Sequence, residues 1–119
     1  MYEAILSFVE LEFNLNAHSI KVNLIVDNVY SLFQLEEIIF ALKDRLVGVN
    51  AGRWGFLASL QLRSKFEKRR LFLEERNDVL IDDDFLVGFN RYIIHIAHKR
   101  GLHCMGGASA FTPARGSQE

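Results

Sequence analysis

The sequence predicts an α/β fold with a mainly parallel sheet. Two observations lead to this prediction. Segments whose apolar residues follow helical spacing alternate along the chain with short strand-like segments, in the order helix, strand, helix, strand, helix, helix, strand. In addition, 50% of the 119 residues are hydrophobic, which is enough apolar material for one compact core and excludes a disordered or collagen-like chain.

The N-terminal part of the chain predicts one helix and one strand. Residues Tyr2 to Phe13 place apolar side chains at helical spacing, and the helix is expected to end near Asn14. From Ile20 to Val26 the period changes to two, which is typical of a strand with one buried face. This strand ends on a carboxylate, Asp27.

The next segment predicts a second helix followed by a second strand. Ser31 and Gln34 have the spacing of a capping box, so a helix is expected to begin there. Its apolar stripe runs from Leu35 to Leu46, and Gly48 is expected to end it. The short stretch Val49 to Trp54 then predicts a buried strand that runs into a tight turn.

The C-terminal half predicts two more helices and further strands. Phe56 to Phe66 has weaker helical spacing, and Leu71 to Ile81 is a candidate for an additional strand. Asp82 to Asp84 supplies N-caps and a favourable negative charge for the next helix, which Lys99 to Gly101 is expected to end. Leu102 to Met105 predicts another short strand.

The composition excludes several classes of function. Lys and Arg number 14 and Asp and Glu 15, a net charge of −1, so no basic excess exists to bind nucleic acid or an anionic membrane. No apolar run reaches the roughly 18 to 20 residues of a membrane span. The single cysteine, Cys104, excludes an internal disulfide and suits a reducing compartment. The N-terminus lacks a secretory signal, so the cytosol is the expected location.

Two neighbouring features are candidates for a functional site. Asp27 follows a strand, where parallel α/β folds place catalytic groups, although an Asp beside Asn28 also suits a plain turn. The glycines of the run Gly48 to Gly55 allow backbone amides to approach an anion, or they simply form a tight turn. Arg53 in that run could bind a carboxylate or pair at the surface.

Two other groups are weaker candidates. His95, His98 and His103, with Cys104 nearby, suggest a zinc site but match no strong ligand pattern, so we favour structural histidines and an inert core cysteine. The basic run Arg63 to Arg70 could contact phosphates, but we favour solvation of a helix end.

Three blocks of the sequence match one family in order and in spacing. Lys43 to Phe56 is similar to a signature that contains Gly-Leu-Asn-x-Gly-Arg-Trp-Asp-Tyr. Ile20 to Asp27 is similar to a strand that ends in Ile-Glu-Thr, and His98 to Gly107 is similar to His-Arg-Arg-Gly-Ala-His-Ala-Met-Gly-Gly. The match extends through Ala110 to Pro113, so that together these stretches cover roughly residues 19 to 113. On them the sequence resembles the shorter form of malate synthase.

The resemblance implies a fold, a reaction and a set of site residues. Residues 1–119 would form part of a (β/α)8 TIM barrel, from an enzyme of the glyoxylate cycle that condenses acetyl-CoA with glyoxylate in the presence of Mg2+ to give malate and CoA. Asp27 matches a glutamate that holds the metal. Gly52, Arg53 and Trp54 match the turn whose amides bind glyoxylate. Peroxisomes or glyoxysomes become alternative locations for a eukaryotic source.

The chain departs from the family pattern at several positions. The second metal ligand, an aspartate, falls on Gly55, so the Mg2+ site is expected to be weak or lost. The signature histidine falls on Arg45 and the tyrosine on Phe56. The enolate-stabilising arginine would precede Met1 and the catalytic base would follow Glu119. The chain alone is therefore expected to be inactive.

The length adds a structural expectation. A barrel of this class takes about 200 to 250 residues, so a partial barrel would leave two sheet edges and an apolar interior uncovered. We expect self-association or docking to a full-length relative. A non-catalytic remnant that serves as an interaction module remains an alternative, as does a divergent acyl-CoA lyase-type barrel with Asp27 as its only protein metal ligand.

Overall fold

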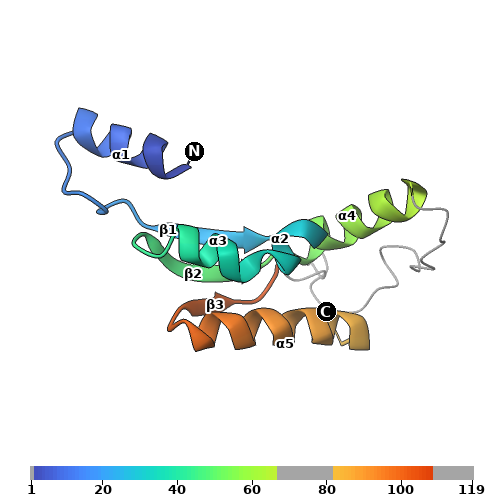
Figure 1. The fold of residues 1–119 in the computed structure, drawn as a ribbon. Coiled ribbons are helices and arrows are strands. Elements are labelled where there is room, and N and C mark those ends of the chain that lie inside the picture. The colour runs from blue at the N-terminus through green and yellow to red at the C-terminus, as the bar shows by residue number, and fades with distance from the viewer. Residues whose placement is uncertain (1, 67–81, 109–119) are drawn as a thin grey trace, which may run out of the picture.

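The computed structural model describes residues 2–66 and 82–108 of the chain, and it confirms the predicted α/β class. The elements are α1 (Tyr2–Glu12), β1 (Val22–Val26), α2 (Val29–Phe33), α3 (Leu35–Ala41), β2 (Leu46–Ala51), α4 (Arg53–Phe66), α5 (Asp84–Lys99) and β3 (His103–Met105). Figure 1 shows the strands side by side, with α5 running along β3 and α1 standing apart from the sheet. Within the described residues, no helix is long and apolar enough to cross a membrane.

The three strands form one parallel sheet in the order β1-β2-β3. Val26 pairs with Ala51 at the end of β1, and Val49 pairs with Cys104 between β2 and β3. Neighbours in sequence are thus neighbours in the sheet, as in a barrel in which each strand is followed by a helix. Since β2 lies in the middle, β1 and β3 are the two edges of the described sheet.

One face of the sheet carries the core. Leu24, Val49 and Cys104 stand in one row on this face, and Val49 is fully buried. The face of α5 toward the sheet is equally buried, and α5 contacts both β2 and β3. The ring of Phe56 on α4 stacks on Phe89 of α5 with the ring centroids 4.1 Å apart, which joins these two helices. The buried apolar residues form one cluster: Val26, Val29, Leu35, Ile39, Leu46, Val49, Ala51, Phe56, Leu57, Leu86, Phe89, Ile93, Ile96 and Ala97.

The opposite face of the sheet is uncovered within the described residues. Ile25 is 55% exposed and Met105 is 45% exposed, and both stand on this face. The alternation predicted for the first strand is therefore confirmed, since Val22, Leu24 and Val26 are more buried than Asn23 and Ile25.

The predicted start of the second helix is wrong. The helix begins at Val29 rather than Ser31, because the side chain of Asn28 caps it by accepting a hydrogen bond from the Ser31 amide at 2.9 Å. The hydroxyl of Ser31 instead donates to the Asn28 carbonyl at 2.9 Å. The helical segment is also interrupted at Gln34, which separates α2 from α3.

The predicted boundary between the second helix and the second strand is also wrong. Leu46 opens β2 and does not belong to the helical stripe, and Gly48 lies inside the strand and does not end a helix. A Cβ at Gly48 would lie 2.9 Å from Asn23 Oδ1 and 3.2 Å from the His103 carbonyl oxygen, so this glycine allows the three strands to approach closely. Strand β2 also ends at Ala51 and not at Trp54, because Arg53 and Trp54 already belong to α4.

The C-terminal elements agree with their predictions. Asp83 occupies the N-cap position of α5 as predicted, but its side chain makes no capping hydrogen bond. Gly101, with φ of 69°, follows the end of this helix as expected for a glycine stop. Strand β3 falls within the predicted strand Leu102 to Met105. The additional strand predicted at Leu71 to Ile81, and the basic run from residue 67 onward, lie outside the described residues.

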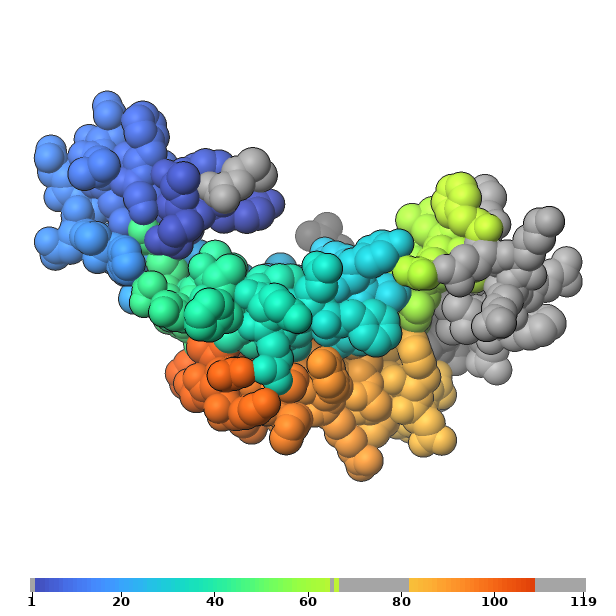
Figure 2. All heavy atoms as spheres, viewed as in Figure 1, coloured from blue at the N-terminus to red at the C-terminus, as the bar shows by residue number. Residues whose placement is uncertain are grey.

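Helix α1 is attached to the sheet by an ion pair. Arg45, which is fully buried just before β2, donates from Nη2 to Glu10 Oε2 at 2.9 Å and from Nε to Glu3 Oε1 at 2.7 Å. Glu10 also accepts the backbone N–H groups of His18 and Ile20. By contrast, apolar side chains of α1 are exposed, with Phe8 at 65%. Figure 2 accordingly shows the atoms of α1 as a lobe beside the main body of the molecule.

Candidate functional site

The C-terminal ends of the three strands meet at one place. Asp27 follows β1, Gly52 follows β2, and Gly107 lies two residues beyond β3. The Gly52 amide donates to the Val26 carbonyl at 2.9 Å, which ties the ends of β1 and β2 together. A Cβ at Gly107 would lie 2.5 Å from the Ala51 carbonyl oxygen, so the segment after β3 packs directly on the end of β2.

The first turn of α4 packs against the end of β1 with no space for side chains. A Cβ at Gly52 would lie 2.8 Å from Asp27 Cβ and 2.8 Å from Ile25 Cγ2. A Cβ at Gly55 would lie 2.8 Å from both the Cβ and the carbonyl oxygen of Asp27. These two glycines are what allow the N-terminus of α4 to reach the strand ends.

Arg53 contributes a buried positive charge to this place. The residue is 4% exposed, and its Nε and Nη2 atoms are buried with no hydrogen-bond partner among the described residues. Its guanidinium carbon lies 4.3 Å from the ring centroid of Trp54, so the two side chains stack. The positive end of the α4 dipole lies at the same turn, and together they favour an anion there.

Asp27 supplies the carboxylate of the site. Its side chain is exposed, and Oδ1 accepts a hydrogen bond from Asn28 Nδ2 at 3.1 Å. Asn28 at the same time caps α2 through its Oδ1 atom, so the helix cap also holds the orientation of Asp27. The sequence predicted Asp27 after one strand and Gly52, Arg53 and Trp54 in the turn after the next. In the structure Gly52 packs against Asp27, and Arg53 stacks on Trp54 at the start of α4.

The zinc site considered from the sequence is not formed. His95, His98 and His103 are all exposed, and within residues 2–66 and 82–108 no three His, Cys, Asp or Glu side chains gather in a way that could hold a metal ion. Cys104 lies half-buried in β3, where burial raises the pKa of its thiol and so disfavours the reactive thiolate.

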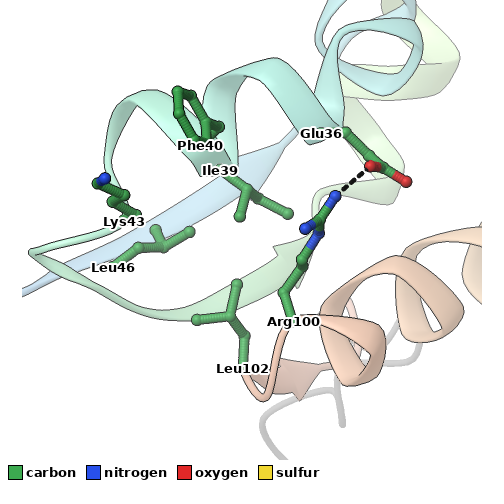
Figure 3. Close-up of a pocket in the computed structure, with 7 residues that line it drawn as sticks. All are labelled: Glu36, Ile39, Phe40, Lys43, Leu46, Arg100 and Leu102. Atoms are coloured by element: carbon green, nitrogen blue, oxygen red, sulfur yellow. Dashed lines mark hydrogen bonds and ion pairs between the residues drawn. The ribbon is translucent and has the colours of Figure 1, made fainter.

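A separate cavity of about 210 Å3 lies near the opposite ends of the strands. Figure 3 shows Arg100 reaching across it from the end of α5 toward Glu36 on α3, where Nη2 donates to Oε2 at 2.5 Å. Lys99 donates to the other carboxylate oxygen, and both bonds hold the pKa of Glu36 below its ordinary value. Apolar side chains form most of the remaining lining: Ile39, Phe40, Leu46 and Leu102, with Lys43. We interpret this cavity as the junction between α3 and α5, away from the candidate site.

Comparison with known proteins establishes the family. The model of the malate synthase TIM barrel domain matches residues 1–119. The chain belongs to the malate synthase family. The match extends beyond the resemblance at residues 19 to 113, since it includes α1. The fold is accordingly that of a TIM-barrel domain, of which three parallel strands are described.

Individual relatives agree with this assignment. The chain is 37% identical to malate synthase A of Escherichia coli (strain K12) over 114 residues, which are 96% of this chain and 21% of the relative. It is 34% identical to the glyoxysomal malate synthase of Brassica napus over 97 residues, which are 82% and 17% of the two chains. It is 30% identical to the bifunctional glyoxylate cycle protein of Caenorhabditis elegans over 118 residues, 99% of this chain and 12% of that protein. The chain thus spans about a fifth or less of the length of these relatives.

Malate synthases use Mg2+, and the residues of this chain do not fit the ion as the family pattern requires. By the resemblance, that pattern has two carboxylates, whereas among the described residues the candidate site has the carboxylate of Asp27. The second position is Gly55, which carries no donor atom and faces Asp27 without space for a side chain. Magnesium needs near-octahedral oxygen coordination, so a single exposed carboxylate is a poor anchor for it.

Proposed function

We propose that this chain supplies the glyoxylate-binding strand ends of a malate-synthase-type barrel and does not carry out the condensation by itself. The observation that supports the proposal is the junction of Gly52 and the first turn of α4 with the end of β1, beside the buried guanidinium of Arg53. Amide groups at a helix N-terminus and a nearby positive charge suit a small carboxylate such as glyoxylate.

Each residue has a distinct part in this proposal. Gly52 forms the turn, and its own amide is bound to the Val26 carbonyl. The backbone amides of Arg53 and Trp54 bind the carboxylate of glyoxylate, and the charge of Arg53 increases the attraction for the anion. Trp54 holds the guanidinium in place by stacking on it at 4.3 Å. Asp27 lies directly against this turn, and we propose that its Mg2+ binding is weak or lost. The acetyl-CoA of the family reaction has no assigned contact in this chain.

No residue is assigned to two groups that the family reaction requires. The condensation needs a base that removes a proton from the acetyl group and an arginine that stabilises the enolate, and no residue of this chain matches either one. We therefore expect no glyoxylate-dependent release of thiol from acetyl-CoA by the purified chain, with or without Mg2+. A thiol signal above that of a no-enzyme blank would contradict this part of the proposal.

Glyoxylate binding can be measured independently of catalysis. Trp54 is the only tryptophan in the chain and lies in the proposed site, so its fluorescence reports on ligand binding there. We expect millimolar glyoxylate to change this fluorescence saturably, and Arg53→Leu to weaken the response. Chloride at equal ionic strength is the control for nonspecific anion effects. A response that is absent, or that chloride reproduces, would contradict glyoxylate binding.

A second candidate function is an interaction module that associates with another copy of the chain. The exposed apolar side chains of the open sheet face, Ile25 and Met105, favour this candidate, because barrels normally enclose such residues. We expect sedimentation velocity to give a mass above that of the 13.7 kDa monomer at tens of micromolar, about the range of weak association. A monomer that unfolds cooperatively at that concentration would count against the module.

A further inference from the structure

We infer that Gly55 is required for close packing of α4 against Asp27. We also infer that this packing prevents the strand ends from forming a binding site for a divalent cation. The inference deepens the proposed function, since it concerns the same site. It differs from the simpler interpretation in which Gly55 has merely lost a carboxylate that one substitution would restore.

Gly55 packs directly against Asp27. A Cβ at position 55 would lie 2.8 Å from Asp27 Cβ and 2.8 Å from the Asp27 carbonyl oxygen. A clash with a flexible side chain would be relieved by a change of rotamer. Here one of the two contacts is to a backbone atom, so the backbone itself would have to move.

Hydrogen bonds hold the backbone on both sides of Asp27. On one side, the Val26 carbonyl accepts the amide of Gly52 at 2.9 Å. On the other side, the amide of Val29 donates to Ser59 Oγ at 3.1 Å. Gly52 and Ser59 lie three residues before and four residues after Gly55 in the sequence. These two hydrogen bonds therefore oppose a shift of the backbone from residue 26 to residue 29 away from position 55.

The described residues around Asp27 also lack the donor atoms that a metal ion needs. Within the described residues, no group of three or more acidic, histidine or cysteine side chains surrounds Asp27. An aspartate at position 55 would need a Cβ where no space exists, so its carboxylate would not reach a common ion beside that of Asp27. Substitution of Gly55 alone is thus expected to disturb the packing and not to create a metal site.

The test combines stability with binding of Mn2+, which serves as the paramagnetic probe for a magnesium-type site. Gly55→Ala and Gly55→Asp are measured in the full chain, with Gly88→Ala as the matched control, because a Cβ at Gly88 meets nothing within 4 Å. We expect both substitutions at position 55 to lower the melting temperature by about 5 °C or more. Gly88→Ala should leave it unchanged or raise it, because alanine favours a helix interior over glycine.

Binding is followed by electron paramagnetic resonance of free Mn2+. We expect neither the wild-type chain nor Gly55→Asp to bind Mn2+ saturably below about 1 mM. The inference is overturned if Gly55→Asp keeps the wild-type melting temperature, if Gly55→Ala is as stable as Gly88→Ala, or if either protein shows saturable binding that Asp27→Asn abolishes. If Gly55→Asp does not fold, the melting temperature of Gly55→Ala decides the matter.

The measurements distinguish failure of this inference from failure of the proposed function. Glyoxylate binding is measured by Trp54 fluorescence without added metal. A lost glyoxylate response together with no Mn2+ binding would refute the proposed function and leave this inference standing. Saturable Mn2+ binding at Asp27 together with a glyoxylate response would refute this inference and the proposed loss of Mg2+ binding, and would leave the proposed glyoxylate binding standing.

Discussion

Ile93→Ala is expected to lower the free energy of unfolding by about 2 to 5 kcal/mol. Ile93 is fully buried in the middle of α5, on the face that packs against β2 and β3. Truncation removes apolar contacts and leaves a cavity, which the packed helix and sheet can only partly close. Since small domains are stabilised by only about 5 to 15 kcal/mol, the loss is a large part of the total.

The adjacent residue provides a control for Ile93→Ala. Ile94 has the same side chain on the same helix but is 43% exposed, so Ile94→Ala should change stability by about 0.5 kcal/mol or less. Both variants are compared by urea denaturation, followed by circular dichroism at the helical minimum. Equal losses in the two variants would contradict the described packing of α5 on the sheet.

The parts of the fold that were predicted correctly are those in which local pattern and tertiary packing agree. Strand β1 alternates buried and exposed residues, and its alternation is already visible in the sequence. Helix α5 has a continuous apolar stripe, an acidic start and a glycine stop, and its described bounds are close to the predicted ones. In each of these elements the apolar residues of the local pattern are the ones that pack against a neighbouring element.

The wrong predictions arise because one residue type can serve more than one structural role. Gly48 resembles a helix stop, but it is needed where β2 passes close to Asn23 and His103. Ser31 resembles an N-cap, but Asn28 takes that role and Ser31 donates back to it. The contacts of Gly48 join distant parts of the chain and leave no mark on local spacing. Asn28 and Ser31 are close in sequence, and both are residue types that can cap a helix.

The candidate site was predictable in position but not in detail. A carboxylate after one strand and a glycine turn after the next indicated Asp27 and Gly52, because parallel strands bring their ends together. The burial of Arg53 and the absence of space at Gly55 depend on packing between separate elements. The ion pair between Glu10 and Arg45 joins residues that are 35 positions apart in the sequence, so no local pattern predicts it.

Glu10→Gln is expected to destabilise the chain strongly at neutral pH, with the melting temperature lowered by about 10 °C. Glu10 holds both terminal nitrogens of the fully buried Arg45, so the substitution leaves a buried guanidinium with only Glu3 as an acidic partner. The control is Glu12→Gln on the same helix, where the side chain is exposed. Glu12→Gln should change the melting temperature by about 2 °C or less.

The pH dependence distinguishes this ion pair from simple packing. Hydrogen bonds from Arg45 lower the pKa of Glu10 from 4.5 to about 2, against the opposing effect of burial. A carboxyl group whose folded pKa is lowered contributes stability above its unfolded pKa and loses it as the pH falls through the folded value. The difference in stability between wild type and Glu10→Gln should therefore be constant from pH 7 to about 5 and shrink between about 4.5 and 2.

The paired substitution tests whether the charge or the contact holds α1 in place. Removing one partner strands a buried charge, whereas replacing both by apolar residues of similar volume does not. Glu10→Leu combined with Arg45→Met should therefore be more stable than Glu10→Leu alone. Between about pH 4.5 and 2 it should lose less stability than the wild type, because the contribution of Glu10 is absent while that of Glu36 remains. Urea denaturation at pH 7 and pH 3 measures both effects. If the double variant is no more stable than the single one, Arg45 and Glu10 act through independent contacts, and α1 is not attached to β2 by their ion pair.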